Sequence, residues 1–272
     1  MRALTCLLLL FFCAAAGAQT PPAGAGNTPL TPEQRRADVY FGRGTAWAEK
    51  GMIDNAIADY TSAIGLDPSL SMAYNNRGLL QMIKGNTELA LADYGEAIRL
   101  DPRVPAYYYN RGGAWLLKGE DEHELADDNE AIRLLPTYAD AYNDRANVWR
   151  RRRDYARALA DYDRALAING KSSLYYRNRG LTHFFQGSFP AARADYATAI
   201  ALEQDAYAAI WHYLASLRAG DADNFTLARN TAWLKVWPAP VVRFYLGQLS
   251  APQLLAAATA ERDPVKRNQQ QC

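Results

Sequence analysis

The chain has 272 residues, of which 49% are hydrophobic, and its 30 basic and 29 acidic side chains nearly cancel. This balance argues against nucleic acid or an anionic membrane surface as the main partner, because both reward a strongly basic face. Two of the three cysteines, Cys6 and Cys13, lie in the N-terminal segment described next. The expected mature chain therefore keeps only Cys272 and has no internal disulfide.

Residues 1–18 have the pattern of a secretory signal peptide. Arg2 gives a positive start, an apolar run covers residues 4–12, and small residues end at Ala18. The apolar run is too short to span a membrane comfortably, so a cleavable signal is favoured over a membrane anchor. Bulky Phe12 before Cys13 disfavours a lipid anchor. We expect cleavage after Ala18, no membrane insertion, and a periplasmic or secreted protein.

Residues 19–36 predict a flexible leader and the start of the first helix. The segment up to residue 30 is rich in Pro, Gly and Ala and has no periodicity. Thr31, Pro32 and Gln34 then match an N-cap, a first-turn proline and a capping-box glutamine. Regular structure is expected to begin there.

A 34-residue period occupies residues 37–204 and runs through five copies. Three positions carry the same residue in every copy: Tyr40, Tyr74, Tyr108, Tyr142 and Tyr176; Arg43, Arg77, Arg111, Arg145 and Arg179; Asp59, Asp93, Asp127, Asp161 and Asp195. A period this strict predicts one supersecondary unit stacked on copies of itself.

Each copy predicts two antiparallel helices, called helix A and helix B. In the first copy, helix A covers about residues 37–50 and helix B about residues 54–66. Glycine marks the turn between them at Gly51, Gly85, Gly119 and Gly187, where a residue without Cβ can adopt positive φ. Arg153 replaces glycine in the fourth copy. Small residues recur where the two helices must approach, at Gly44, Gly78, Gly112, Ala146 and Gly180.

These features resemble the tetratricopeptide repeat (TPR) family. The first copy reads Tyr40, Gly44, Trp47, Ala56, Tyr60, Ala63 and Pro68, and the second reads Tyr74, Gly78, Ala90, Tyr94, Ala97 and Pro102. The resemblance implies an all-α, right-handed superhelical solenoid of antiparallel helix pairs. It implies binding of other proteins, but no particular activity.

The third copy departs from this pattern. Glu124 stands where the family has alanine, and Asp128 stands where the other copies have tyrosine. One interpretation is a local helix shift that brings Leu125 inward and lets Asp128 reach an arginine or a tyrosine hydroxyl. The alternative is a polar notch used by a ligand. Either way this is expected to be the least stable seam, because an unpaired buried carboxylate is costly.

Residues 205–272 predict a degenerate sixth repeat and a helical cap. Helices are expected at about residues 207–218, 225–235, 241–246 and 250–261. The segments 211–215 and 244–247 are similar to exported bacterial TPR proteins of the cell-envelope lipoprotein scaffold type. That similarity implies cell-wall or other envelope enzymes as partners. In those relatives a further repeat usually follows, so this chain would leave an apolar end open to a second subunit, which allows a homodimer.

No catalytic, cofactor or metal site is predicted. The three histidines, His123, His183 and His212, have no partner at the spacing of a helical metal site, and no phosphate-binding loop or nucleophile motif occurs. The repeated arginines and aspartates are expected to pair with one another, which favours a structural role over a charged binding track.

The candidate binding surface is the concave face of helix A. The positions that line this face in TPR proteins give a groove that begins apolar and becomes basic. Its members are Asn75, Leu79, Met82, Tyr109, Asn143, Asn147, Arg150, Arg177 and Phe184. Asparagine amides suit an extended backbone, and arginines suit acidic groups. The sequence thus predicts a non-enzymatic scaffold or adaptor of the cell envelope. The alternative is a structural protein that self-assembles through its C-terminal end.

Overall fold

The computed structural model describes residues 30–220, 224–232, 234 and 238–259. Over these residues the chain forms 14 helices and no strand, which confirms the all-α prediction. The predicted signal peptide, residues 19–29 of the predicted leader and Cys272 lie outside the described residues. None of the described helices has the length and hydropathy that a membrane span needs.

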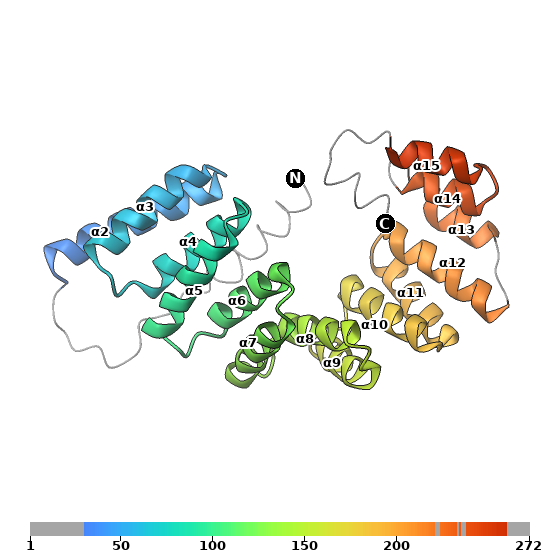
Figure 1. The fold of residues 1–272 in the computed structure, drawn as a ribbon, viewed down its shortest axis with the longest axis horizontal. Coiled ribbons are helices and arrows are strands. Elements are labelled where there is room, and N and C mark those ends of the chain that lie inside the picture. Colours follow the sequence, from blue (N-terminus) through green and yellow to red (C-terminus); the bar gives the residue numbers. More distant parts are fainter. Residues whose placement is uncertain (1–29, 221–223, 233, 235–237, 260–272) are drawn as a thin grey trace. The chain divides into compact units, whose positions relative to one another are not determined.

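The chain divides into two compact units, Met1–Pro136 and Thr137–Cys272. The first unit holds three helix pairs, coloured blue to green in Figure 1: α2 (Pro32–Glu49) with α3 (Ile53–Leu66), α4 (Ser71–Ile83) with α5 (Thr87–Leu100), and α6 (Pro105–Lys118) with α7 (Asp121–Leu134). Each pair is one repeat, with helix A first and helix B second.

The second unit continues the same pattern (Figure 1). Its two complete pairs are α8 (Ala139–Arg151) with α9 (Tyr155–Ile168) and α10 (Ser173–Gln186) with α11 (Phe189–Leu202). A further helix A, α12 (Ala206–Ala219), packs on α11. Three shorter helices follow: α13 (Asn224–Thr231), α14 (Ala239–Tyr245) and α15 (Ala251–Thr259).

The helix boundaries follow from local chemistry. The Thr31 hydroxyl accepts from the Gln34 backbone N–H, and the Gln34 side chain accepts from the Thr31 N–H, so α2 begins at Pro32, as the predicted capping box indicates. The predicted turn glycines all adopt positive φ, between 71° and 86°. Arg153 takes the same conformation at φ 61°, because the A–B turn requires it whatever residue is present.

The core of each regular repeat is a tyrosine of helix B packed against a small residue of helix A. Tyr60, Tyr94, Tyr162 and Tyr196 are fully buried. A Cβ added to Gly78 would lie 2.8 Å from the Tyr94 ring, and one added to Gly44 would lie 3.0 Å from the Tyr60 ring. This close approach explains why the small residues recur at this position.

The third repeat keeps its register despite its unusual residues. Helix α7 begins and ends 34 residues after α5. Leu125 is buried at the position that Leu91 occupies in α5. Glu124 and Asp128 are each only 1% exposed. Because neither side chain reaches the surface, the structure shows no open polar notch at this point.

The C-terminal helices build a small core of their own. Ile210 and Tyr213 of α12 pack with Leu227 of α13 and Val242 of α14. Helix α13 ends at Thr231, four residues before the predicted end, and α14 starts at Ala239, two residues before its predicted start. The sixth repeat is therefore present as a helix A followed by a shortened partner, in agreement with its weak register.

Candidate functional site

The repeated arginines and aspartates pair within each repeat, as predicted. Two guanidinium nitrogens of each arginine donate to the two carboxylate oxygens of the aspartate 16 residues later, at 2.6 to 3.0 Å. Each guanidinium also lies over the ring of the tyrosine three residues earlier, 5.0 to 5.9 Å from its centroid. All five carboxylates are buried. These charges are used inside the repeats and do not form a ligand track.

The pKa shifts agree with this pairing. The hydrogen bond from Arg43 holds the pKa of Asp59 below its ordinary value. In turn, the bonds to their aspartates raise the pKa of Arg77 and Arg111. These shifts favour the charged forms of Asp59, Arg77 and Arg111, and each pair fixes helix A against helix B.

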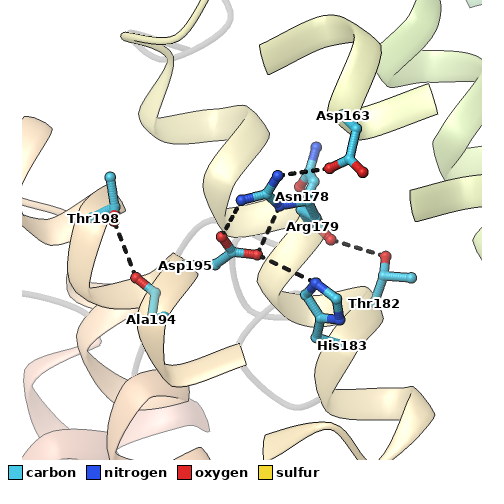
Figure 2. Close-up of polar contacts among 8 residues, drawn as sticks. All are labelled: Asp163, Asn178, Arg179, Thr182, His183, Ala194, Asp195 and Thr198. Atoms are coloured by element: carbon cyan, nitrogen blue, oxygen red, sulfur yellow. Dashed lines mark hydrogen bonds and ion pairs between the residues drawn. The ribbon is translucent and has the colours of Figure 1, made fainter. Parts of the chain in front are cut away.

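Figure 2 shows how the fifth repeat extends this pairing. Arg179 bonds Asp195 of α11 and also Asp163 of α9, at 2.7 Å, so one guanidinium joins three helices. The Nε2 atom of His183 lies 3.8 Å from the Asp195 carboxylate in the same view. Burial lowers the pKa of His183, and the negative charge of Asp195 only partly opposes it. The folded chain therefore favours the neutral form of the His183 imidazole.

Acid should weaken the fold through His183. A depressed pKa means that the unfolded chain binds the proton more readily than the folded chain near the ordinary value of 6.5. The free energy of unfolding should therefore fall as the pH drops through 6.5 toward the lower folded pKa. His183→Gln, the residue that α4 has at Gln81, should flatten this dependence in urea titrations. His212, whose pKa burial also lowers, should leave a residual slope.

The exposed His123 provides the matched control, because its side chain is 60% accessible. His123→Gln should leave the slope of stability against pH as it is in the parent chain. Equal slopes for the parent chain and His183→Gln between about pH 7.5 and 5 would contradict the assignment of His183 as a buried neutral histidine.

In the first unit, the predicted groove residues lie partly beneath the surface. Asn75 is buried, and its Oδ1 accepts from the Asn110 side chain of the next helix A at 2.8 Å. Leu79 and Met82 pack against the buried cluster around Tyr94. Tyr109 is half-buried. Asn75 thus connects two neighbouring A helices, and its buried amide is not available to a ligand in this arrangement.

The predicted residues of the second unit show the same arrangement with more charge. Asn143 is buried and accepts from Asn178 at 2.9 Å. The Asn147 Oδ1 accepts from the Tyr162 hydroxyl at 2.7 Å and from Arg150 at 3.4 Å. This amide therefore joins helix A to helix B within the fourth repeat.

Arg177 and Phe184 of α10 both connect that helix to its surroundings. Arg177 donates to the Asp205 carboxylate at 2.7 Å. The Phe184 ring meets the rings of Phe189 and Trp211 edge-on, at 5.3 and 5.1 Å between centroids. Phe184 therefore contributes mainly to packing, while Arg177 keeps part of its guanidinium accessible.

The second unit also contains a hollow of about 290 Å³ between α10, α11 and α12. Six residues line it: Arg177, Asn178, Leu181, Tyr196, Tyr207 and Trp211. Of the predicted groove residues, only Arg177 is among them. Trp211 lies 34 residues after Arg177, so extending the groove positions into the sixth repeat would have found it. Tyr196 is one of the fully buried core tyrosines, and nothing in its sequence context marks it as part of a hollow.

The described residues contain no group of three or more His, Cys, Asp or Glu side chains that could hold a metal ion. The described chain is built of stacked helical hairpins. Its repeated charges are paired inside the repeats, and a hollow lies between adjacent A helices. These features define a helical repeat protein of the kind that presents extended binding surfaces.

Comparisons with known proteins identify the repeat. Tetratricopeptide repeat models match residues 37–70, 71–104 and 139–172, which are the first, second and fourth copies. The chain is a tetratricopeptide repeat protein. No curated protein sequence matches it.

Solved structures share the fold at low identity. PilF of Pseudomonas aeruginosa is 18% identical with a TM-score of 0.68, and the match covers 80% of this chain and all of PilF. MamA is 24% identical with a TM-score of 0.57, covering 62% of this chain and 93% of MamA. YrrB, described as a TPR protein with an unusual peptide-binding site, is 18% identical with a TM-score of 0.55, covering 68% of this chain and 91% of YrrB.

Proposed function

We propose that this protein is a non-enzymatic scaffold or adaptor of the cell envelope that binds a peptide or helix of another protein along its A helices. TPR solenoids generally act as interaction surfaces rather than as catalysts. The envelope location depends on the predicted signal peptide, and envelope enzymes are the partners that this location favours.

The observation that carries the proposal is the hollow between α10 and α12, with apolar side chains exposed around it. Phe185, on the same helix as Arg177, is 52% exposed, and Tyr207 on the hollow's wall is 49% exposed. Aromatic side chains beside a pocket with polar groups are typical of peptide-binding surfaces. The peptide-binding site reported for YrrB offers a precedent on a similar fold.

Self-assembly through the C-terminal end is the alternative. Leu217 of α12 is 47% exposed and Leu255 of α15 is 60% exposed, so that part of the second unit presents apolar surface. Sedimentation of the purified chain distinguishes the two functions, because a scaffold for other proteins does not need to dimerise.

Phe185→Ser should weaken partner binding without unfolding the chain. Phe185 lies next to the proposed surface, and loss of one aromatic contact in an interface costs about 1 kcal/mol or more, which is about fivefold in affinity. The measurement is quantitative mass spectrometry of partners that are crosslinked in envelope extract and captured with the tagged chain.

Leu202→Ser provides the matched control. Leu202 is similarly exposed, at 42%, but lies at the end of helix B in the same unit. The parent chain and Leu202→Ser should capture the same proteins in similar amounts. Phe185→Ser should capture at least fivefold less of these proteins, because it loses about 1 kcal/mol of binding free energy. The same partners recovered in equal amounts with both variants would remove the A helices of the second unit from the proposal.

A further inference from the structure

Tyr196 differs from Tyr60 and Tyr162 in the partner of its hydroxyl. The Tyr60 hydroxyl lies 3.2 Å from the Thr45 hydroxyl, and the Tyr162 hydroxyl donates to Asn147 at 2.7 Å. In both cases the partner lies on helix A, 15 residues earlier. For Tyr196 that position is Leu181, which has no polar atom. Within the described part of the chain, the buried Tyr196 hydroxyl has no hydrogen-bond partner. Such a group is costly and calls for an explanation.

Tyr196 forms part of the hollow described above. Leu181, Tyr207 and Trp211 give this hollow apolar walls, and Arg177 adds a cation. The Arg177 side chain is 34% exposed, and within the described residues it spends one of its five N–H donors, on Asp205. Asp205 is held in place by accepting from two backbone N–H groups at the start of α12, at 2.9 and 3.0 Å.

Charges of both signs surround this hydroxyl. Burial, together with Asp195 and Asp205, raises the pKa of Tyr196, while Arg150 and Arg177 act in the opposite direction. Both aspartates are already paired, Asp195 with Arg179 and Asp205 with Arg177. The groups that lack a hydrogen-bond partner in the described structure are donors, the Tyr196 hydroxyl and the buried Nε–H of Arg150. A hydrogen-bond acceptor is therefore the complementary ligand, and a carboxylate is the acceptor that suits the Arg177 guanidinium.

We propose that this hollow binds a carboxylate that is carried next to an apolar group on the bound peptide. The carboxylate would accept hydrogen bonds from the Tyr196 hydroxyl and from the unused N–H groups of Arg177. The apolar group would pack on Leu181 and Trp211. Because the hydroxyl is covered in the free protein, a side chain of the hollow must move to admit the ligand.

This inference depends on the proposed scaffold function and names the chemistry that the scaffold recognises. Two sources supply such a carboxylate: the C-terminal end of a partner chain, or an Asp or Glu side chain within it. The residues of the hollow are compatible with both, so the experiment must separate them.

The test uses arrays of random 12-residue peptides and three forms of the full chain: the parent, Tyr196→Phe and Tyr60→Phe. One array has free C-terminal ends, a second has amidated ends, and a third has amidated ends and lacks Asp and Glu. The parent chain should prefer peptides with a carboxylate, and Tyr196→Phe should reduce that preference about tenfold, since a hydrogen bond to a charged group is lost. Tyr60→Phe should bind like the parent.

Stability separates binding from a structural effect. Tyr196→Phe removes a hydroxyl without a partner in the described structure, so its melting temperature should equal or exceed that of the parent. Tyr60→Phe loses its bond to Thr45 and should melt lower. Loss of binding on amidation would identify the chain end as the source. Binding that survives amidation but fails on the third array would identify the acidic side chain.

Two outcomes would overturn the inference in different ways. If peptides bind and the preference for a carboxylate is the same in the parent and Tyr196→Phe, the hollow is not the carboxylate site, while the scaffold function stands. If no array binds the parent chain, the proposed peptide-binding function fails together with this inference.

Discussion

Arg111→Leu is expected to lower the free energy of unfolding by about 3 kcal/mol, because it leaves the buried charge of Asp127 without its partner. In the folded chain Arg111 donates two hydrogen bonds to Asp127, at 2.7 and 2.8 Å, and the carboxylate is only 3% exposed. Urea unfolding of the purified chain, followed by far-UV circular dichroism, measures the loss. Peptide affinity of the folded protein should change less than twofold if the pair is purely structural.

A second substitution should rescue the first. The double variant Arg111→Leu/Asp127→Leu removes both charges, so it should be more stable than Arg111→Leu alone. Arg99→Leu provides the control: its ion pair with Glu96 is exposed, 65% and 45% for the two side chains, and its loss should cost no more than about 0.5 kcal/mol. Arg111→Leu and Arg99→Leu with equal stability would show that the repeated pairs do not hold the helices together.

Gly78→Ala should lower the free energy of unfolding by about 2 kcal/mol, as expected for overpacking at a tight helix contact. The added methyl group would lie 2.8 Å from the Tyr94 ring, so α4 and α5 must move apart. Ala146 stands at this position in the fourth repeat, where the packed helices accept it. The cost at Gly78 is therefore the cost of displacing Tyr94.

The third repeat gives an internal comparison for this prediction. A Cβ on Gly112 would meet Asp128 Oδ1 at 3.3 Å and nothing closer, because the tyrosine is missing there. Gly112→Ala should therefore be close to neutral, since alanine gains about 0.5 to 1 kcal/mol over glycine inside a helix. Thermal and urea melts of the two variants measure the difference. Equal destabilisation would mean that the tyrosine contact does not select glycine at this position.

Both predictions concern contacts inside the repeats. In helix A the glycine and the arginine fix the helix to helix B, and the asparagines bond the next helix A. Arg177, Phe185 and Trp211 of the second unit are partly or fully exposed and remain available for binding.

The sequence by itself determined the fold class, the repeat length and the pairing of arginine with aspartate. Each of these depends on contacts inside one helical hairpin. Because the hairpin recurs in the same register, the residues that make these contacts recur at the same positions in each copy. Thr31 and the turn glycines are equally local, because a cap or a positive φ involves only a few neighbouring residues. For this reason their predicted roles match the structure.

Only the tertiary structure decided which side chains reach solvent. Asn75 and Asn143 occupy groove positions in the sequence, yet both are buried by a neighbouring A helix, because their amides bond the asparagine 35 residues later. Tyr196 has the sequence of an ordinary core tyrosine, and its hydroxyl is distinguished by having no hydrogen-bond partner in the described structure. Such properties arise from contacts between neighbouring repeats. They cannot be predicted from the residue pattern within a single hairpin.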